Sequence, residues 1–190
     1  MSRVRKKTRR RIATDKQSAS LPIFQMPEAI IDAQRWRLNV DGLVENSLKL
    51  SIQEVVSLPS VRVRDDFTCL EGWTVKGITW KGVRVSELLA LAAAKSTARC
   101  VVFGSGDYTQ GMSIKRCMEP TTILAYELND TPLRAEHGAP LRLVSRGQEC
   151  FESVKWVQSM HLTHEREQGS ARKIALGRIT RLPQLRRSEN

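Results

Sequence analysis

The residue with the clearest chemical potential is Cys69, which follows a predicted strand and begins the segment Cys69-Leu70-Glu71-Gly72-Trp73. Side chains at a strand end can reach a ligand, because loops held by a rigid scaffold often carry binding residues. A thiolate at this position could bind a soft transition metal, and Glu71 could either influence proton transfer beside it or pair with an Arg as structure. A cysteine without such context is more often a small buried hydrophobic residue. The isolated residue leaves both interpretations of Cys69 open.

Two later segments contain side chains that suit an anionic ligand. Residues 137–142 begin with His137 and end with Arg142, and Lys155 follows Ser153 two residues later. Arg and Lys bind phosphate oxygens through charge-assisted hydrogen bonds, and backbone N–H groups in turns can add to them. The same residue types also occur as solvated surface charges, and a histidine beside glycine is often a turn residue. Only their joint spacing favours a binding site.

The elements that must position these residues indicate a mixture of strands and a few helices. Alternation and short apolar runs predict strands at residues 36–40, 48–50, 61–67, 100–103, 123–128, 140–144 and 154–162. Ser51 and Glu54 form a capping-box pattern that predicts a short helix ended by Pro59, and a second helix is predicted from near Ser86 to near Lys95. No βαβ rhythm is present. This order predicts an α+β domain with mixed or mainly antiparallel sheets.

Charge divides the 190-residue chain into three parts. Residues 1–16 hold eight Lys or Arg and one Asp, and residues 166–190 hold seven Lys or Arg and two Glu. The two tails together carry +12 of a net charge of +11, so the rest of the chain is nearly neutral at −1. We predict a basic disordered arm over residues 1–20, a folded domain over residues 21–165 and a basic tail over residues 166–190. Basic tails can attract polyanions, but runs of like charge are more often simply solvated.

The cysteines and the N-terminus exclude several other classes of protein. Cys69, Cys100, Cys117 and Cys150 form no C-x-x-C pair, so their spacing indicates neither a zinc site nor a redox dithiol, and we expect no disulfide framework. The run Arg9-Arg10-Arg11 is not followed by the apolar region of an export signal. No stretch approaches the roughly 20 apolar residues that a membrane-spanning helix needs. We therefore predict a cytoplasmic protein.

Three ordered blocks of the sequence resemble the molybdopterin-binding domain of the sulfite-oxidase family. In that family a strand-end cysteine before a W-x-G-V type of segment binds molybdenum, which matches Cys69 ahead of residues 80–83. Residues 137–142 and 153–156 match the next two blocks with the family's spacing. The resemblance covers roughly residues 36–165. The Cys-x-Glu pattern is more similar to the bacterial branch related to a methionine-sulfoxide reductase catalytic subunit than to the animal sulfite oxidases.

The resemblance implies both a cofactor and a set of residues that hold it. The cofactor is molybdopterin carrying molybdenum, with Cys69 as the metal ligand and Cys69 and Glu71 as the catalytic residues. The implied pterin-binding residues are Ser105, His137, Arg142, Ser153, Val154 and Lys155, with the Ser153-Val154 backbone cradling the cofactor. A thiolate suits a redox-active metal already held by the sulfurs of the pterin, and it must be deprotonated to bind.

The leading hypothesis is a molybdenum-dependent oxidoreductase that transfers an oxygen atom to or from a small substrate of the sulfite or sulfoxide type. One loop departs from the family pattern, which commonly has a Pro-Gly-x-Tyr-Gly-like run here. In this chain residues 145–150 are Ser-Arg-Gly-Gln-Glu-Cys, with Glu149 in place of the tyrosine and Cys150 in place of the second glycine. This departure motivates an alternative hypothesis, a non-catalytic binder or carrier of the molybdenum cofactor. A polyanion-binding protein that uses the basic tails is a third hypothesis.

The partners implied by the leading hypothesis are few. We expect a small-molecule substrate and an electron donor or acceptor that the sequence does not identify. The extra dimerisation domain of full sulfite oxidases has no counterpart here, so a monomer is predicted. Neither a membrane nor a nucleic acid is an expected partner, because the basic tails lack the interleaved aromatic residues that stack on bases.

Overall fold

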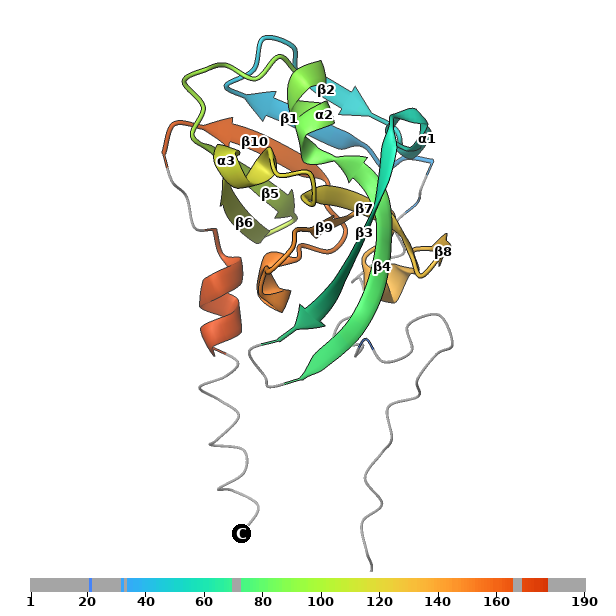
Figure 1. The fold of residues 1–190 in the computed structure, drawn as a ribbon. Helices are drawn as coiled ribbons and strands as arrows, with labels where there is room; N and C mark the ends of the chain where they lie inside the picture. The colour runs from blue at the N-terminus through green and yellow to red at the C-terminus, as the bar shows by residue number, and fades with distance from the viewer. Residues whose placement is uncertain (1–20, 22–31, 33, 70–72, 166–168, 178–190) are drawn as a thin grey trace, which may run out of the picture.

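The computed structural model describes residues 21, 32, 34–69, 73–165 and 169–177, and within them the chain forms two five-stranded sheets (Figure 1). The first sheet has the order β2-β1-β10-β5-β6, from β1 (Leu38–Gly42), β2 (Leu48–Leu50), β5 (Cys100–Ser105), β6 (Tyr108–Ser113) and β10 (Ser159–Thr163). The second has the order β3-β4-β7-β8 with β9 also paired to β7, from β3 (Ser60–Thr68), β4 (Thr74–Arg84), β7 (Ile123–Leu128), β8 (Thr131–Pro132) and β9 (Arg142–Val144).

Short helices connect and cover these sheets. They are α1 (Ile52–Ser57), α2 (Val85–Leu91), α3 (Ile114–Cys117) and the 3₁₀ turns η1 (Ala135–His137) and η2 (Cys150–Glu152). Residues 171–177 form a further helix near the end of the described chain. The pairing of β1 with β10 is parallel and the pairings within the second sheet are antiparallel. The prediction of an α+β domain with mainly antiparallel sheets is confirmed.

Strand β7 lies between two parts of the hydrophobic core. Successive side chains of a strand point to opposite faces of its sheet. Leu124 accordingly packs in the larger cluster with Phe103, whereas Ala125 packs in a second cluster with Val63 and Trp80. The second sheet is therefore buried on both faces at β7, which explains the nearly continuous apolar run of this strand.

The predicted capping box at the start of α1 is confirmed. The Glu54 backbone N–H donates to the Ser51 hydroxyl oxygen at 3.3 Å, and the Ser51 backbone N–H donates to the Glu54 carboxylate at 2.7 Å. The second predicted helix is shorter than expected, because α2 ends at Leu91 rather than near Lys95. The backbone of Ala93 adopts a left-handed φ of 50°, which turns the chain out of the helix.

The longest strand, β4, was not predicted, and a bulge explains why. Its buried residues switch phase, since Val75 is buried and the next buried residues are Ile78 and Trp80. Gly77 stands between them with φ 66°, and its N–H donates to the Asp66 carboxylate at 2.8 Å. An extra residue at a β-bulge shifts the side chains that follow to the other face, so a simple period of two is lost.

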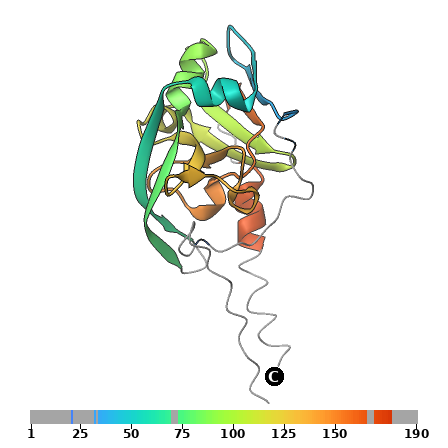
Figure 2. The same ribbon diagram turned by 90° about the vertical axis from the view of Figure 1, so that its right-hand side faces the viewer.

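The paired strands β3 and β4 form a long curved hairpin along one side of the molecule (Figure 2). Cys69 lies directly after β3, at the end of this hairpin where the two strands are connected, and its N–H donates to the Trp73 carbonyl at 3.0 Å. Within the described residues, no helix is both long and apolar enough to span a membrane. The hairpin and the connections around β9 are the elements that place the predicted site residues.

Candidate cofactor site

Close contact at Gly138 brings two of the predicted blocks together. Gly138 ends η1 with a left-handed φ of 110°, and a Cβ atom built on it would lie 3.0 Å from the Lys155 Cβ. The Trp156 backbone N–H donates to the Gly138 carbonyl at 3.1 Å. A side chain at position 138 would therefore be both strained and crowded. Glycine here allows the segments 137–142 and 153–156 to lie side by side.

Arg142 is the central cation of the site. Its side chain is buried, with a residue exposure of 4%, and its Nε donates to the Ser153 hydroxyl at 2.8 Å while its Nη1 donates to the His137 carbonyl at 3.0 Å. The guanidinium carbon lies 4.9 Å from the centre of the Phe67 ring and 5.2 Å from that of Trp80. Burial lowers the pKa of Arg142 to about 10, so the group stays charged at neutral pH.

Lys155 is a second cation beside the first, and it is half-buried. Its ammonium donates to the Glu136 carbonyl at 2.6 Å and lies 5.5 Å from the centre of the Trp156 ring. Burial, and then repulsion from Arg142, lowers the pKa of Lys155 to about 7. At neutral pH this amine is close to its titration midpoint, so a nearby anion would favour its charged form.

His137 completes the cluster with a buried imidazole. Its exposure is 1%, and burial followed by repulsion from Arg142 and Lys155 lowers its pKa to about 4. The ring is therefore neutral at pH 7. Its Nε2 atom is buried and has no hydrogen-bond partner among the described residues. Such an atom is costly to leave unsatisfied, which is evidence for a ligand that would bond to it.

The basic cluster, defined as His137, Arg142, Ser153 and Lys155, has the properties of an anion site. Neither Arg142, which is buried, nor Lys155, which is half-buried, forms an ion pair with a carboxylate of the described chain, although the Glu136 carboxylate lies near enough to Lys155 to favour its charged form. Buried charges are normally paired, because desolvation of an isolated charge is expensive. An anionic ligand would supply the missing negative charge.

Two other predicted pterin-binding residues, Val154 and Ser105, are not part of the basic cluster. Val154 is fully buried, its N–H donates to the Glu152 carbonyl at 3.0 Å and its carbonyl accepts from Leu143 N–H at 2.9 Å, so its backbone is engaged within the chain. Ser105 ends β5, is partly exposed and has no direct contact with the basic cluster among the described interactions. The roles of both residues stay predictions.

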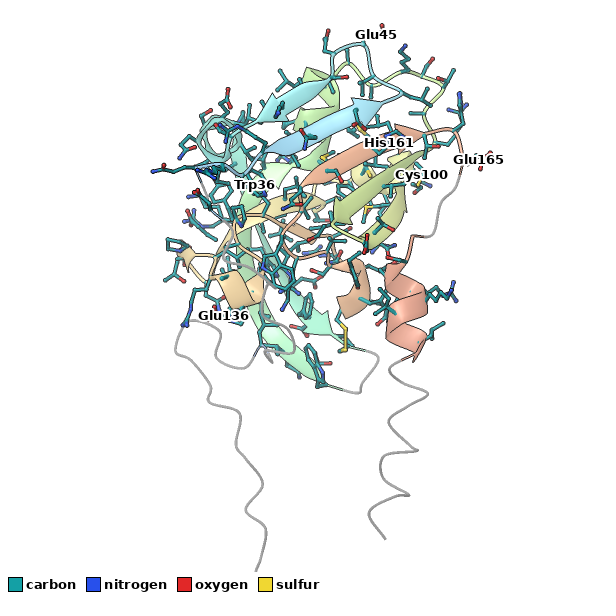
Figure 3. All side chains as sticks on the ribbon, turned by 180° about the vertical axis from the view of Figure 1, so that it is seen from behind. Trp36, Glu45, Cys100, Glu136, His161 and Glu165 are labelled. Carbon is teal, nitrogen blue, oxygen red and sulfur yellow. A yellow bond between two sulfur atoms is a disulfide. The ribbon has the colours of Figure 1, made fainter. Side chains whose placement is uncertain are left out.

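Cys69 does not stand as a free thiol. It is buried at 6% exposure and forms a disulfide with Cys150, with the two Cα atoms 4.9 Å apart across 81 residues of sequence (Figure 3). The cysteine spacing predicted no disulfide framework, and this single bond was not expected from the sequence. Its role as metal ligand stays a prediction, since a disulfide sulfur must be reduced before it can bind as a thiolate. Glu71 lies outside the described residues.

Phe67 links Cys69 to the basic cluster, and sequence reasoning did not identify it as a site residue. Its ring lies against the Arg142 guanidinium, and the residue stands near the end of β3, two positions before Cys69. Trp80, on β4, contacts the same guanidinium. The sequence did contain a signal for this contact, because Phe67 and Trp80 are aromatic residues in the segments before and after Cys69. Cys150 was noted as a departure from the family, but its contact with Cys69 was not predicted.

The cysteine loop, defined as residues 145–150, is attached to the second sheet at β3 and just before β7. The Ser145 hydroxyl lies 2.8 Å from that of Thr122, and Gly147 N–H donates to the Asp65 carboxylate at 3.3 Å. At its end, Glu149 and Glu152 form a reciprocal capping box around η2. The loop thus has a defined conformation although its sequence departs from the family pattern.

A sequence model of the oxidoreductase molybdopterin binding domain matches residues 24–171. The chain belongs to this family. Uncharacterized oxidoreductase YuiH of Bacillus subtilis is 32% identical over 139 residues, which are 73% of this chain and 70% of that protein. The methionine-sulfoxide reductase catalytic subunit MsrP of Campylobacter jejuni is 26% identical over 152 residues, covering 70% of this chain and 51% of MsrP.

A solved structure supports the same conclusion for the fold of this molybdopterin-binding domain. The sulfane dehydrogenase SoxCD of Paracoccus pantotrophus superimposes with a TM-score of 0.67 at 25% sequence identity, covering 72% of this chain and 40% of that one. The predicted family, fold class and oxidoreductase class are confirmed, and so is molybdopterin as the cofactor. The carrier alternative is not favoured, because the matched relatives are oxidoreductases. The chain spans about half or less of the length of MsrP and SoxCD.

The basic cluster fits the cofactor of this family. Molybdopterin carries a phosphate, which the buried Arg142 and the half-buried Lys155, neither of them ion-paired with a carboxylate among the described residues, would bind through charge-assisted hydrogen bonds. The unsatisfied Nε2 of His137 could bond to a polar group of the pterin. At the metal end of the cofactor, reduction of the Cys69–Cys150 disulfide would give Cys69 a free thiolate, which is a soft donor suited to molybdenum. The donor types therefore match the two ends of the cofactor.

Proposed function

We propose that this molybdopterin-binding domain catalyses transfer of an oxygen atom to or from a small substrate of the sulfite or sulfoxide type. The observation that carries the proposal is the basic cluster, in which the buried Arg142 and the half-buried Lys155 form no ion pair with a carboxylate among the described residues. Such a cluster suits an anionic cofactor held at a constant position. The family supplies the identity of that cofactor.

Arg142, Lys155 and His137 would each contact a different part of the cofactor or contribute a different interaction. Arg142 stays charged and is oriented by Ser153 and the His137 carbonyl, so it would bind the phosphate with little rearrangement. Lys155 would gain charge as the anion arrives, because its pKa of about 7 would rise beside a phosphate. His137 would stay neutral and use Nε2 as donor or acceptor, depending on its tautomer.

At the other end of the cofactor, Cys69 would bind the metal through its thiolate. Phe67, two residues before Cys69, and Trp80 on β4 both contact the Arg142 guanidinium with their rings. When bound, the cofactor supplies the two-electron redox chemistry of oxygen transfer, and the protein supplies position and charge. Glu71 is proposed to influence proton transfer on the substrate side.

The test is metal analysis and turnover of protein produced in a host that makes the molybdenum cofactor. We expect about one molybdenum and one pterin phosphate per chain, with oxidation of sulfite or reduction of dimethyl sulfoxide in the presence of an artificial electron mediator. Cys69→Ser should lose molybdenum. A wild-type protein with full cofactor but no turnover on either substrate would contradict the proposed oxygen transfer.

A second variant tests the anion site independently of the metal ligand. Lys155→Met should lower cofactor content about tenfold or more, because one charge-assisted hydrogen bond contributes roughly 1.5–3 kcal/mol. The folded apoprotein should not lose stability, since the replaced ammonium is buried at a cost, as its lowered pKa indicates. Lys95→Met, which removes an exposed lysine near Glu45, is the matched control and should leave cofactor content unchanged.

The monomeric state and cytoplasmic location stay predictions, which size-exclusion chromatography and cell fractionation would check.

A further inference from the structure

Cys150 places a second sulfur at the predicted metal ligand. Cys69 follows β3 and Cys150 begins η2, so the two residues come from different elements that tertiary packing brings together. They are bonded as a disulfide. Position 150 is the one at which the family resemblance predicted a glycine, and this chain has a cysteine there.

Several contacts other than the disulfide hold the two cysteines close to each other. The cysteine loop is tied to β3 by Gly147 N–H donating to the Asp65 carboxylate at 3.3 Å and by Arg146 donating to the Arg64 carbonyl at 3.3 Å. On the other side of Cys150, the Tyr108 hydroxyl donates to the Phe151 carbonyl at 2.6 Å. Because these contacts do not depend on the disulfide, reduction would leave the two thiols facing each other.

The accessibility of the two sulfurs differs. Cys69 is buried, whereas Cys150 lies in a partly exposed turn. In thiol–disulfide exchange an attacking thiolate must reach one sulfur of the bond, and the other sulfur then leaves. Attack on Cys150 would release Cys69, which is the sulfur that the metal requires. Cys117, by contrast, is fully buried, and burial raises its pKa to about 12, so this thiol is not reactive at neutral pH.

We propose that Cys69 and Cys150 form a thiol–disulfide pair that controls loading of the molybdenum cofactor. This inference rests on the proposed role of Cys69 as metal ligand. In the disulfide form the Cys69 sulfur is bonded to Cys150 and cannot bind a metal. A dithiol reductant attacks Cys150, the Cys69–Cys150 bond breaks, and Cys69 leaves as a thiolate. The second thiol of the reductant then releases Cys150 as a thiol and closes the reductant's own disulfide, so two electrons pass from reductant to protein.

The experiment uses the full chain produced without cofactor and divided into an oxidised and a dithiothreitol-reduced sample. Each sample is incubated with molybdenum cofactor released from a donor protein, and the excess is removed. Molybdenum per chain is measured by mass spectrometry of the metal. The state of each cysteine is measured by alkylation and peptide mass mapping. We expect the reduced sample to contain at least tenfold more molybdenum than the oxidised one, with loading proportional to the fraction of reduced Cys69.

Variants separate this inference from the proposed function. Cys150→Ala should load equally with and without dithiothreitol, because Cys69 then has no partner. Cys117→Ala, the matched control, should keep the dependence on reduction shown by the wild type. Cys69→Ala should fail to load in either state. If Cys69→Ala loaded molybdenum normally, Cys69 would not be the metal ligand. This result would overturn the proposed function of Cys69 as well as the proposal that a disulfide regulates loading.

Two outcomes would overturn the inference while leaving the proposed function intact. One is equal loading of the oxidised and reduced wild-type samples when peptide mapping shows the Cys69–Cys150 crosslink in the first. The other is a Cys150→Ala protein that still needs dithiothreitol to load. If Cys150→Ala does not fold, as judged by circular dichroism, titration of the wild type with dithiothreitol decides the question, since molybdenum content must follow the reduced fraction of Cys69.

Discussion

The basic cluster and the cysteine loop lie side by side in this domain, yet they are built in opposite ways. The basic cluster keeps the residue types of the family and is buried, with Arg142 bonded to Ser153 and to the His137 carbonyl. The cysteine loop departs from the family and is partly exposed, and it is attached mainly through hydrogen bonds at its two ends. We therefore expect substitutions in the basic cluster to affect stability and cofactor content more than substitutions in the cysteine loop.

The largest effect is expected at the centre of the basic cluster. Arg142→Ala removes two charge-assisted hydrogen bonds and two ring contacts, and it leaves the Ser153 hydroxyl and the His137 carbonyl without this donor. Relief of repulsion with Lys155 offsets part of this loss. We expect the free energy of unfolding to fall by about 2–4 kcal/mol, and cofactor to be absent.

Urea unfolding of the apoprotein and metal analysis would measure these two effects of Arg142→Ala. Arg142→Lys is the informative control, because it keeps the charge but not the planar fork that reaches Ser153 and His137 together. If Arg142→Ala unfolded at the wild-type urea concentration, the interior of the basic cluster would not be the rigid part of the site.

A smaller effect is expected from pH, through His137. Its folded pKa of about 4 lies below the ordinary value of 6.5, so the unfolded chain binds the proton first as the pH falls. The stability associated with neutral His137 is complete above about pH 6.5 and is lost as the pH falls towards 4. The loss should be on the order of 2–3 kcal/mol.

His137→Gln cannot take up this proton, so its unfolding free energy should fall less than that of the wild type between pH 7 and pH 4.5. Urea unfolding of both proteins at the two pH values gives the comparison. The same exchange at the exposed His161, which lies 2.6 Å from the Asp41 carboxylate, is the control for a histidine outside the cluster. Parallel profiles for the wild type and His137→Gln would contradict the burial of a neutral imidazole.

The smallest effect is expected in the cysteine loop. Arg146→Ala removes an exposed pair with Asp65 at 3.9 Å and a hydrogen bond to the Arg64 carbonyl. Exposed ion pairs contribute little, so the unfolding free energy should change by less than about 1 kcal/mol and cofactor content should stay the same. Thermal unfolding with metal analysis would check both values. A loss as large as that of Arg142→Ala would remove the contrast between the two regions.

Much of the fold could be predicted because local rules are satisfied in many of its elements. The capping box at Ser51 and the apolar run of β7 depend on neighbours in sequence, and both were predicted correctly. Strand β4 was missed because the bulge at Gly77 breaks the period of two, and α2 was predicted too long because the turn at Ala93 has no strong sequence signal. Both errors arise where the backbone departs locally from regular geometry.

The candidate site was predictable to the extent that its residues lie in short blocks. His137, Arg142 and Lys155 have types and spacing that indicate an anionic cofactor, and the structure brings them together. The partners that tune them could not be predicted in the same way. Phe67 contacts Arg142 from a strand far away in sequence, and the pKa values of Lys155 and His137 depend on burial that no local pattern specifies.

By itself the sequence determined the chemical types available to this domain: one strand-end thiol, two cations and a histidine at fixed spacing, on strands and short helices whose patterns are local. Only the tertiary structure decided that Cys69 meets Cys150 across 81 residues and that both cations lack a carboxylate partner among the described residues. The physical reason is that contacts between distant segments, and the desolvation they cause, are set by how the two sheets and their loops pack.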